Sequence, residues 1–453
     1  MEHEKNSSDL KRSLGFFSVL SIVMGTVIGA GVFFKVAAVT ASTGSSALSL
    51  FAWLLGGIIS LCGGLTVAEL AAAFPDTGGM IKYIEHTYGN IAGFLLGWAQ
   101  SILYFPAMVA ALSVIFGQQF VALFALNSHL VVPIAITAAV TIVLINFASS
   151  KAGGYFQTFT LVLKMLPIAL IVIFGLFQPH GVNVQLFPIH AGKNMEFLPA
   201  LGGGLLATMF AYDGWIHVGN VAGEVKKPEK TLPLAITAGL IGVMIVYLLV
   251  NFAFLHTLGF SEIIGNENAA AQVAAKIFGG FGGKIVTIGI LVSVYGAING
   301  YTLTGMRQPY TLATEKRLPF WRQLQKLSAR TQVPVNAGLF QLAVAVILIL
   351  VSELSADAFD NLSNLLVFVI WIFYTLTFIA VIILRARDRV EDTPLKRPYK
   401  VPLYPIVPAI ATIGGLFILL MTLVNQPELA LIGIGVTLLG LPFYFYLNKK
   451  YKK

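Results

Sequence analysis

The sequence predicts an all-α protein that crosses a membrane many times. Of its 453 residues, 57% are hydrophobic and only 11% are charged, and the mean hydropathy is +0.84. A soluble domain of this length does not need so much apolar surface, whereas a polytopic membrane protein does. The second observation is that membrane-length apolar runs recur along the whole chain, with no soluble domain between them.

Twelve of these runs are long enough to span a bilayer as helices, which predicts 12 transmembrane helices. In chain order they occupy residues 16–38, 46–74, 90–120, 130–148, 153–178, 197–222, 232–257, 279–306, 334–352, 360–384, 403–424 and 428–447. The polar residues 1–14 predict a short cytoplasmic tail. They do not predict a signal peptide, because no small-residue cleavage site follows the first run.

The distribution of basic residues predicts the orientation in the membrane. If the N-terminus is cytoplasmic, 24 of the 29 lysine and arginine residues fall in the tails and loops on that side. This positive-inside bias places both termini in the cytoplasm of a plasma (inner) membrane protein. The net charge of +9 is therefore interpreted as an orientation signal with some attraction to anionic lipid, and no nucleic-acid partner is expected.

The first span is interrupted by three glycines between Gly25 and Gly31. Each glycine weakens a helix by roughly 1 kcal/mol, and lipid supplies no water for freed backbone groups. A break at this depth is typical of secondary transporters, which hold small charged solutes on unwound backbone. The alternative is a helix-packing face of small residues. A phosphate-binding glycine loop is disfavoured because no strand-then-helix unit surrounds the segment.

The sixth span carries a second interruption, where Gly202-Gly203-Gly204 is followed by the residues from Phe210 to Trp215. The starts of the two broken helices are five spans apart, so the halves that contain them enter the membrane in opposite directions. This predicts a 5+5 inverted repeat with a site at the midplane. The expected divisions are repeat one at 15–180, repeat two at 195–386, and spans 11–12 with a cytoplasmic tail at 387–453.

The two breaks predict a site for a zwitterion. Free amides of the first break would bind a carboxylate, because a half-helix begins there with a partial positive charge. Free carbonyls of the second break would accept from an ammonium. The residues assigned to these walls are Val27, Ile28, Gly29, Ala30 and Gly31 on one side, and Phe210 and Ala211 on the other.

Three further residues are assigned to the substrate pocket, namely Tyr104, Asp213 and Asn299. Tyr104 and Asn299 are expected to help shape it, although intramembrane polar groups also form interhelical bonds. Asp213 has two interpretations. It pairs with a cationic substrate, or it caps the half-helix that follows it, and the second is preferred because aspartate accepts bonds from first-turn amides.

Lys164 lies roughly 16 Å along the fifth span, close to the middle of the bilayer. A lysine at a helix centre costs about 2.5–3.5 kcal/mol to insert, so a partner is expected. The carbonyls of the first break are the natural acceptors, and the ammonium would then imitate a bound cation. Alternatively, loss of its proton on burial would couple transport to protons.

Glu69, at the end of the second span, is expected either to pair with a cytoplasmic base as a gate or to end a capped helix. Tyr247 and Ser293 are further polar residues within spans, and Ser293 is favoured for a functional role. The only cysteine, Cys62, lies in the second span, so no disulfide is expected.

These residues together resemble the amino acid–polyamine–organocation superfamily, and within it the L-type amino acid transporter family. The similarity is strongest to bacterial serine/threonine or alanine-serine-cysteine exchangers, and it covers the chain from about Leu14 to Tyr446. The segments that carry it are Gly25 to Gly31, Ala68-Glu69-Leu70, Phe74-Pro75 with Gly78-Gly79 and Tyr83, Phe210 to Trp215, and Glu224 to Pro228.

The resemblance implies twelve spans, alternating access, and sodium-independent exchange of neutral L-amino acids. It implies that Lys164 replaces the sodium ion of related symporters and bridges Gly25 to Ser293. Human relatives attach to a heavy subunit through a cysteine after span 3. The corresponding loop here, Leu123 to His129, has none, so no disulfide-linked heavy subunit is expected. Asp213 departs from relatives with a small residue there and leaves the substrate's charge open.

Other functions fit the sequence less well. An ion channel would need a continuous polar lining or a charged ring, which the spans lack. An enzyme would need a paired nucleophile and base or a metal cluster. No enzyme activity, cofactor or metal site is therefore expected. The alternative within transport is a proton-coupled amino acid symporter.

Overall fold

The computed structural model describes residues 15–74, 79–148, 150–353, 357–389 and 395–451, and within these ranges it contains helices and no strand. The helices are α1 (Phe16–Val27), α2 (Gly31–Thr43), α3 (Ser46–Ala73), α4 (Gly79–Tyr88), α5 (Asn90–Ala99), α6 (Phe105–Leu123), α7 (Val131–Ala148), α8 (Ser150–Leu176), α9 (Phe197–Ala211), α10 (Pro228–Leu258), α11 (Phe260–Ile263), α12 (Ala269–Gly305), α13 (Arg307–Thr314), α14 (Trp321–Leu324), α15 (Val335–Ser352), α16 (Ala358–Arg387), α17 (Ile406–Asn425), α18 (Pro427–Leu438) and α19 (Gly440–Tyr451). A π-helix, η1 (Gln100–Tyr104), joins α5 to α6, and two 3₁₀ helices are η2 (Ser128–Leu130) and η3 (Trp215–Glu224). The predicted tail 1–14 and the motif residues 75–78 lie outside the described ranges.

The prediction of an all-α polytopic membrane protein is confirmed. Across the described ranges, nine helices are long and apolar enough to cross a membrane, and the pair α1–α2, bent by 44°, makes a tenth. The apolar helix α9 and the apolar half of α8 are shorter and correspond to the other two predicted runs. The number twelve and the two-repeat division therefore stay predictions.

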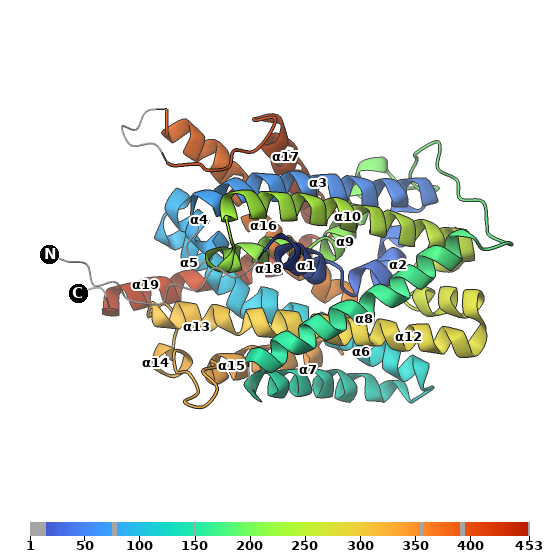
Figure 1. Cartoon of the computed structure of the whole chain (residues 1–453), viewed down its shortest axis with the longest axis horizontal. Helices are drawn as coiled ribbons and strands as arrows, with labels where there is room; N and C mark the ends of the chain where they lie inside the picture. Colours follow the sequence, from blue (N-terminus) through green and yellow to red (C-terminus); the bar gives the residue numbers. More distant parts are fainter. Residues whose placement is uncertain (1–14, 75–78, 149, 354–356, 390–394, 452–453) are drawn as a thin grey trace.

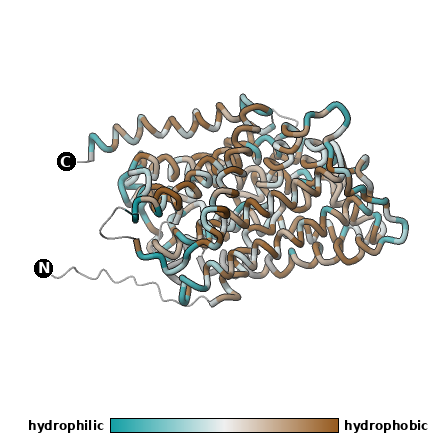
Figure 2. The backbone as a smooth tube through the Cα atoms, turned by 90° about the horizontal axis from the view of Figure 1, so that it is seen from above, coloured by the Kyte–Doolittle hydropathy of each residue, from teal (hydrophilic) through white to brown (hydrophobic). Residues whose placement is uncertain are grey.

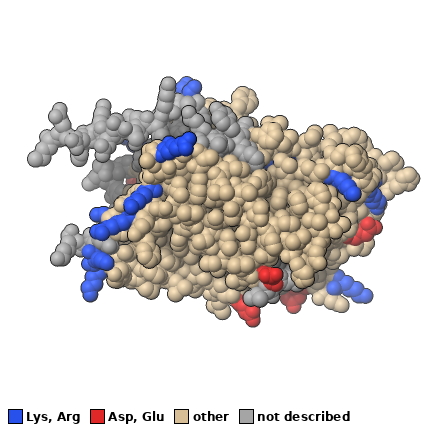
Figure 3. Space-filling model, turned by 90° about the horizontal axis from the view of Figure 1, so that it is seen from below, with Lys and Arg blue, Asp and Glu red and all other residues tan. Residues whose placement is uncertain are grey.

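The long helices run roughly along one axis of the molecule (Figure 1). Their middle portions are hydrophobic, and polar residues gather in the turns at the two ends (Figure 2). On the face drawn in Figure 3, the visible lysine and arginine side chains also lie toward those ends, and the surface between them is mostly uncharged, with a few acidic side chains along its lower edge. The connectors predicted to be cytoplasmic share one end, where α4, α13, α14 and α19 lie, as the inside prediction requires.

Two groups of helices position the centre of the protein. The first group consists of α1, α2, α3, α9 and α10, which pack against one another, and the second consists of α6, α7, α12 and α15. Two helices connect the groups: α8 packs on both α10 and α12, while α16 packs on α3, α6 and α9. Contacts from α8 and α16 therefore hold the groups together, along with direct packing of α12 on α2 and α10.

Candidate functional site: two helix breaks and their polar partners

The first predicted break is present, and residues 28–30 separate α1 from α2. Ile28 is extended, with φ −71° and ψ 100°, and this conformation ends α1. In the part of the chain that the structure describes, the amides of Gly29, Ala30 and Gly31 donate no backbone hydrogen bond. Three donors are thus available at the start of α2, as the carboxylate hypothesis requires.

The second break lies at Tyr212 to Gly214, immediately after α9 ends at Ala211. Gly214 has φ +105°, a left-handed conformation that a side chain disfavours. The chain then continues as the 3₁₀ helix η3, so the half-helix expected after Asp213 is a 3₁₀ helix. The run Gly202-Gly203-Gly204 does not interrupt the span, because it lies inside α9, where the side chains of Met421, Ser42 and Thr43 approach closely.

The two breaks touch each other. A Cβ added at Gly31 would lie 2.6 Å from the Cα of Ala211, and one added at Gly214 would lie 3.0 Å from the carbonyl oxygen of Thr26. Glycine is required at Gly31 because any side chain there would push the two broken helices apart. The glycines therefore serve close approach as well as unwinding, so the packing-face interpretation is correct in part.

Lys164 reaches the first break from α8. Its side chain is buried, and its ammonium donates to the carbonyl oxygens of Gly25 and Ile28, the second at 2.5 Å. Both carbonyls are available because the helix stops before it can supply their usual amide partners. The expected bond from Lys164 to Ser293 is not formed. The Ser293 hydroxyl is buried without a hydrogen-bond partner among the described residues, and Ile28 takes its place.

Tyr247, on α10, joins the two breaks. Its hydroxyl lies 2.8 Å from the carbonyl oxygens of both Val27 and Ala211, and its single proton can be donated to one of them at a time. Trp53 and Tyr212 pack around the Tyr247 ring with centroids 5.5 and 5.0 Å away. The Ala211 carbonyl, predicted to receive the substrate ammonium, is therefore already shared with a tyrosine.

Asp213 is the centre of a buried polar cluster. Tyr104 donates a hydrogen bond to one of its carboxylate oxygens, and Tyr374 on α16 donates to the other at 2.7 Å. His217 lies 3.1 Å from the Tyr104 hydroxyl. The side chain of Asp213 thus links η1 and α16 to the second break. The backbone amide of Gly214, the residue before η3, also donates to the Asp213 carboxylate, which is the kind of bond that the capping interpretation expects.

Tyr374 and His217 belong to this cluster but were not predicted from the sequence. Both are polar residues within predicted spans, and this is the only feature of the sequence that could have identified them. The π-helix η1 ends at Tyr104, and its wider turn contributes to where that side chain points. Asn299 lies elsewhere: its amide oxygen accepts an interhelical hydrogen bond from Asn146 on α7 at 2.8 Å.

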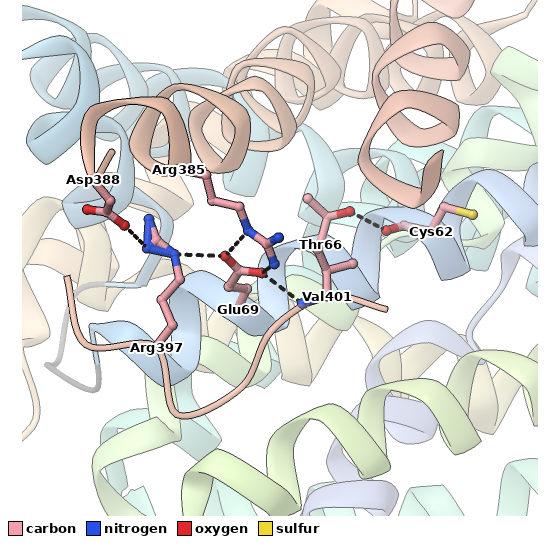
Figure 4. Close-up of polar contacts among 7 residues, drawn as sticks. All are labelled: Cys62, Thr66, Glu69, Arg385, Asp388, Arg397 and Val401. Atoms are coloured by element: carbon pink, nitrogen blue, oxygen red, sulfur yellow. Dashed lines mark hydrogen bonds and ion pairs between the residues drawn. The ribbon is translucent and has the colours of Figure 1, made fainter. Parts of the chain in front are cut away.

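Glu69 pairs with two bases at the predicted cytoplasmic end (Figure 4). Arg385 on α16 donates to both carboxylate oxygens, at 2.9 and 2.5 Å, and Arg397 donates to one at 2.9 Å. The amide of Val401 also donates to Glu69, at 2.7 Å, and Arg397 pairs with Asp388. Of the two interpretations of Glu69, the structure therefore supports pairing with basic residues. The role of Glu69 as a gate stays a prediction.

Residues of both breaks are buried, except Gly29, which is half-buried. None of four pockets found among the described residues is lined by residues 25–31 or 210–214. The midplane site predicted between the two breaks is thus not among these pockets. The site in this conformation is a set of backbone donors and acceptors enclosed by side chains.

The fold and this arrangement define a multi-pass membrane protein whose broken helices meet at a buried polar centre, the architecture of a transporter. A family profile for amino acid permeases matches residues 14–441, and the chain belongs to the amino acid permease family. This confirms the resemblance noted from the sequence motifs.

Three relatives are similar over nearly the whole chain. The serine/threonine exchanger SteT of Bacillus subtilis (strain 168) is 42% identical over 447 residues, covering 97% of this chain and 98% of its own length. The cystine/glutamate transporter of Homo sapiens is 30% identical, covering 96% of this chain and 85% of its own length. The large neutral amino acids transporter small subunit 2 of Mus musculus is also 30% identical, covering 96% and 81%. These relatives are transporters, which confirms that the chain is not an enzyme.

Proposed function

We propose that this protein is a sodium-independent exchanger of small neutral L-amino acids that works by alternating access. The observation that carries the proposal is the contact of the Lys164 ammonium with the carbonyls of Gly25 and Ile28. A covalently attached cation at the first break would remove the need for a mobile sodium ion there. The name of the 42% identical relative, a serine/threonine exchanger, favours small hydroxylated substrates.

In this proposal the substrate carboxylate binds the free amides between Val27 and Gly31, where α2 begins. The substrate ammonium binds the carbonyls of Phe210 and Ala211. Because Tyr247 already contacts the Ala211 carbonyl, arrival of the substrate would redirect its hydroxyl proton to the Val27 carbonyl. Tyr247 would thereby report occupancy of the second break to the first.

The competing proposal is a proton-coupled amino acid symporter. One observation favours it: the hydrogen bonds of the Lys164 ammonium go to two neutral carbonyls, and no salt bridge is found for it among the described residues. A buried cation without a counter-ion is costly, so release of its proton during the cycle is chemically reasonable.

Proteoliposome uptake separates the two proposals. Vesicles preloaded with unlabelled serine are compared with empty vesicles, in sodium-containing and sodium-free buffer, with and without an inward proton gradient. An exchanger takes up labelled serine only into loaded vesicles, in either buffer, with no response to the gradient. Accumulation in empty vesicles that follows the proton gradient would establish the symporter instead. Competition by twenty unlabelled amino acids defines the substrate range.

We further propose that both termini face the cytoplasm of a plasma (inner) membrane protein, on the basis of the positive-inside bias. The chain would act without a disulfide-linked heavy subunit, since its only cysteine, Cys62, is buried. Protease or tag accessibility in right-side-out and inverted vesicles tests the orientation.

A further inference from the structure

Lys35, on α2, is a second buried lysine besides Lys164. Its side chain is fully buried, and its ammonium lies 2.5 Å from a carboxylate oxygen of Asp360 on α16. It also donates to the hydroxyl of Ser363, one turn further along α16. A buried ammonium requires partners of this kind, and both come from α16, one of the two helices that connect the groups.

Two aromatic rings complete the surroundings of Lys35. Its ammonium lies 5.2 Å from the ring centroid of Phe210 and 4.6 Å from that of Phe359. The rings contact each other edge to face, with centroids 5.4 Å apart. Cations are attracted to aromatic faces at these distances. Because Phe210 directly precedes the last residue of α9, Lys35 fixes a ring beside the second helix break.

The helix α16 contacts the first group and the second break through three polar pairs along its length. Asp360 pairs with Lys35, Tyr374 with Asp213, and Arg385 with Glu69. At 1.5 Å per residue these positions are separated by about 21 Å and about 17 Å. The Lys35 pair is therefore near the predicted outer end, the Asp213 pair central, and the Glu69 pair at the predicted inner end.

The outer pair differs from the inner one in its access to water. The side chain of Asp360 is 31% exposed, whereas that of Glu69 is 1% exposed. Two other acids, Glu267 and Asp357, also lie in this region. Burial, and then the negative charges of Asp360 and Asp357, raise the pKa of Glu267, while Lys35 acts in the opposite sense. Water competes for Asp360, and the other two acids compete with Asp360 for the Lys35 ammonium. The bond between Lys35 and Asp360 can therefore open as well as close.

We propose that Lys35 is a positioning residue for transport: its bond to Asp360 and Ser363 holds Phe210 and Phe359 together and closes the outer path to the two breaks. These five residues are called the outer latch. Release of Lys35 from Asp360 would free α2 and Phe210 to move away from α16 and admit substrate. The inference rests on the proposed exchange function, and its test uses a measurement that does not require exchange.

A cysteine beside the first break reports opening of the outer path. Ala297, on α12, is suitable because its Cβ lies 3.7 Å from where a Cβ of Gly29 would be. Since Cys62 is the only native cysteine, Ala297→Cys in a Cys62→Ser background carries a single thiol. The rate of its reaction with a membrane-impermeant maleimide, added from outside to intact cells, is the readout.

In that background, Lys35→Met and Asp360→Asn are expected to react about tenfold faster, because the closed conformation loses its bond. The charge swap Lys35→Asp with Asp360→Lys is expected to restore slow labelling. Lys276→Met, which removes an exposed lysine on the same predicted side, should label at the parental rate. Size-exclusion chromatography confirms folding; if Lys35→Met does not fold, Asp360→Asn carries the test, since that carboxylate is partly exposed.

Parental labelling rates in the folded single variants, or fast labelling that persists in the charge swap, would overturn the outer latch. Faster labelling in a protein that does not exchange amino acids would leave the latch in place and reject the exchanger. Parental labelling rates in variants of a protein that exchanges amino acids would reject the outer latch and leave the exchanger in place.

Discussion

The ammonium of Lys164 lies 2.5 Å from the carbonyl oxygen of Ile28, the residue at which the first helix stops. The same ammonium also bonds the carbonyl of Gly25. One side chain from α8 therefore satisfies two of the carbonyls that the end of α1 leaves without amide partners. This cross-link holds the inner part of span 1 to a helix that also packs on the second group.

Replacing Lys164 by alanine is expected to leave a folded protein with exchange reduced more than tenfold. The two carbonyls would lose their donor, and the end of α1 would lose its connection to α8. Initial rates of labelled serine uptake into loaded proteoliposomes measure the effect. Lys284→Ala, which removes an exposed lysine on α12, serves as the control. Wild-type rates in Lys164→Ala would remove this residue from the mechanism.

Tyr247→Phe removes one hydroxyl and keeps the ring. We expect a loss of about 0.5–1.5 kcal/mol in stability, the usual net value of a hydrogen bond, and a larger fractional loss of exchange. Thermal unfolding in detergent and uptake rates measure the two effects. Tyr295→Phe is a matched control, since Tyr295 bonds Thr141 away from the breaks. Equal effects in the two variants would argue against a special role for Tyr247.

Asp213→Asn tests the two roles left open for this carboxylate. Because Tyr104 and Tyr374 already donate to both of its oxygens, we expect a structural effect, with stability lower by about 1.5–3 kcal/mol for the charge-assisted bonds. Neutral amino acids should still compete for transport, and lysine and arginine should not compete even in the wild type. Competition by cationic amino acids that disappears in Asp213→Asn would instead make Asp213 a substrate ligand.

Glu69→Gln leaves two arginines facing a neutral group. Breaking a buried ion pair in this way costs about 3–5 kcal/mol, so a marked drop in unfolding temperature is expected. Glu428→Gln, at an exposed position on α18, should have no effect. If Glu69 instead acts only as a gate, whose ion pairs break when the protein opens inward, Glu69→Gln would change stability little and would raise or lower the uptake rate.

The pair Glu85–Arg317 predicts a pH dependence at the predicted cytoplasmic end. Burial acts to raise the pKa of Glu85, but hydrogen bonds from Arg317 and Lys82 outweigh it and lower the pKa from its ordinary 4.5. Because the pKa of Glu85 is lower in the folded protein than in the unfolded chain, the ion pair stabilises the fold fully above pH 4.5. This stabilisation is lost as the pH falls through the lower pKa of the folded protein. Arg317→Ala should therefore destabilise the protein at pH 7 and have a smaller effect at pH 3. An equal effect at both values would contradict this assignment.

Composition and residue type were enough to predict much of this protein. Apolar runs indicate membrane spans even when the packing of the helices is unknown, because lipid forces each backbone segment to satisfy its own hydrogen bonds. A glycine-rich interruption and a lysine near the middle of a span are each too costly in lipid to lack a partner. For that reason Gly25 to Gly31 and Lys164 were identifiable before any contact was known.

Only the tertiary structure decided which groups meet. Nothing local to Tyr374 or Arg385 marks them as partners of Asp213 and Glu69, more than 150 residues away, because these bonds depend on where α16 packs. The replacement of Ser293 by Ile28 as a Lys164 acceptor has the same cause. Chain composition determined that buried charges and freed backbone groups would exist, whereas helix packing determined how each was satisfied.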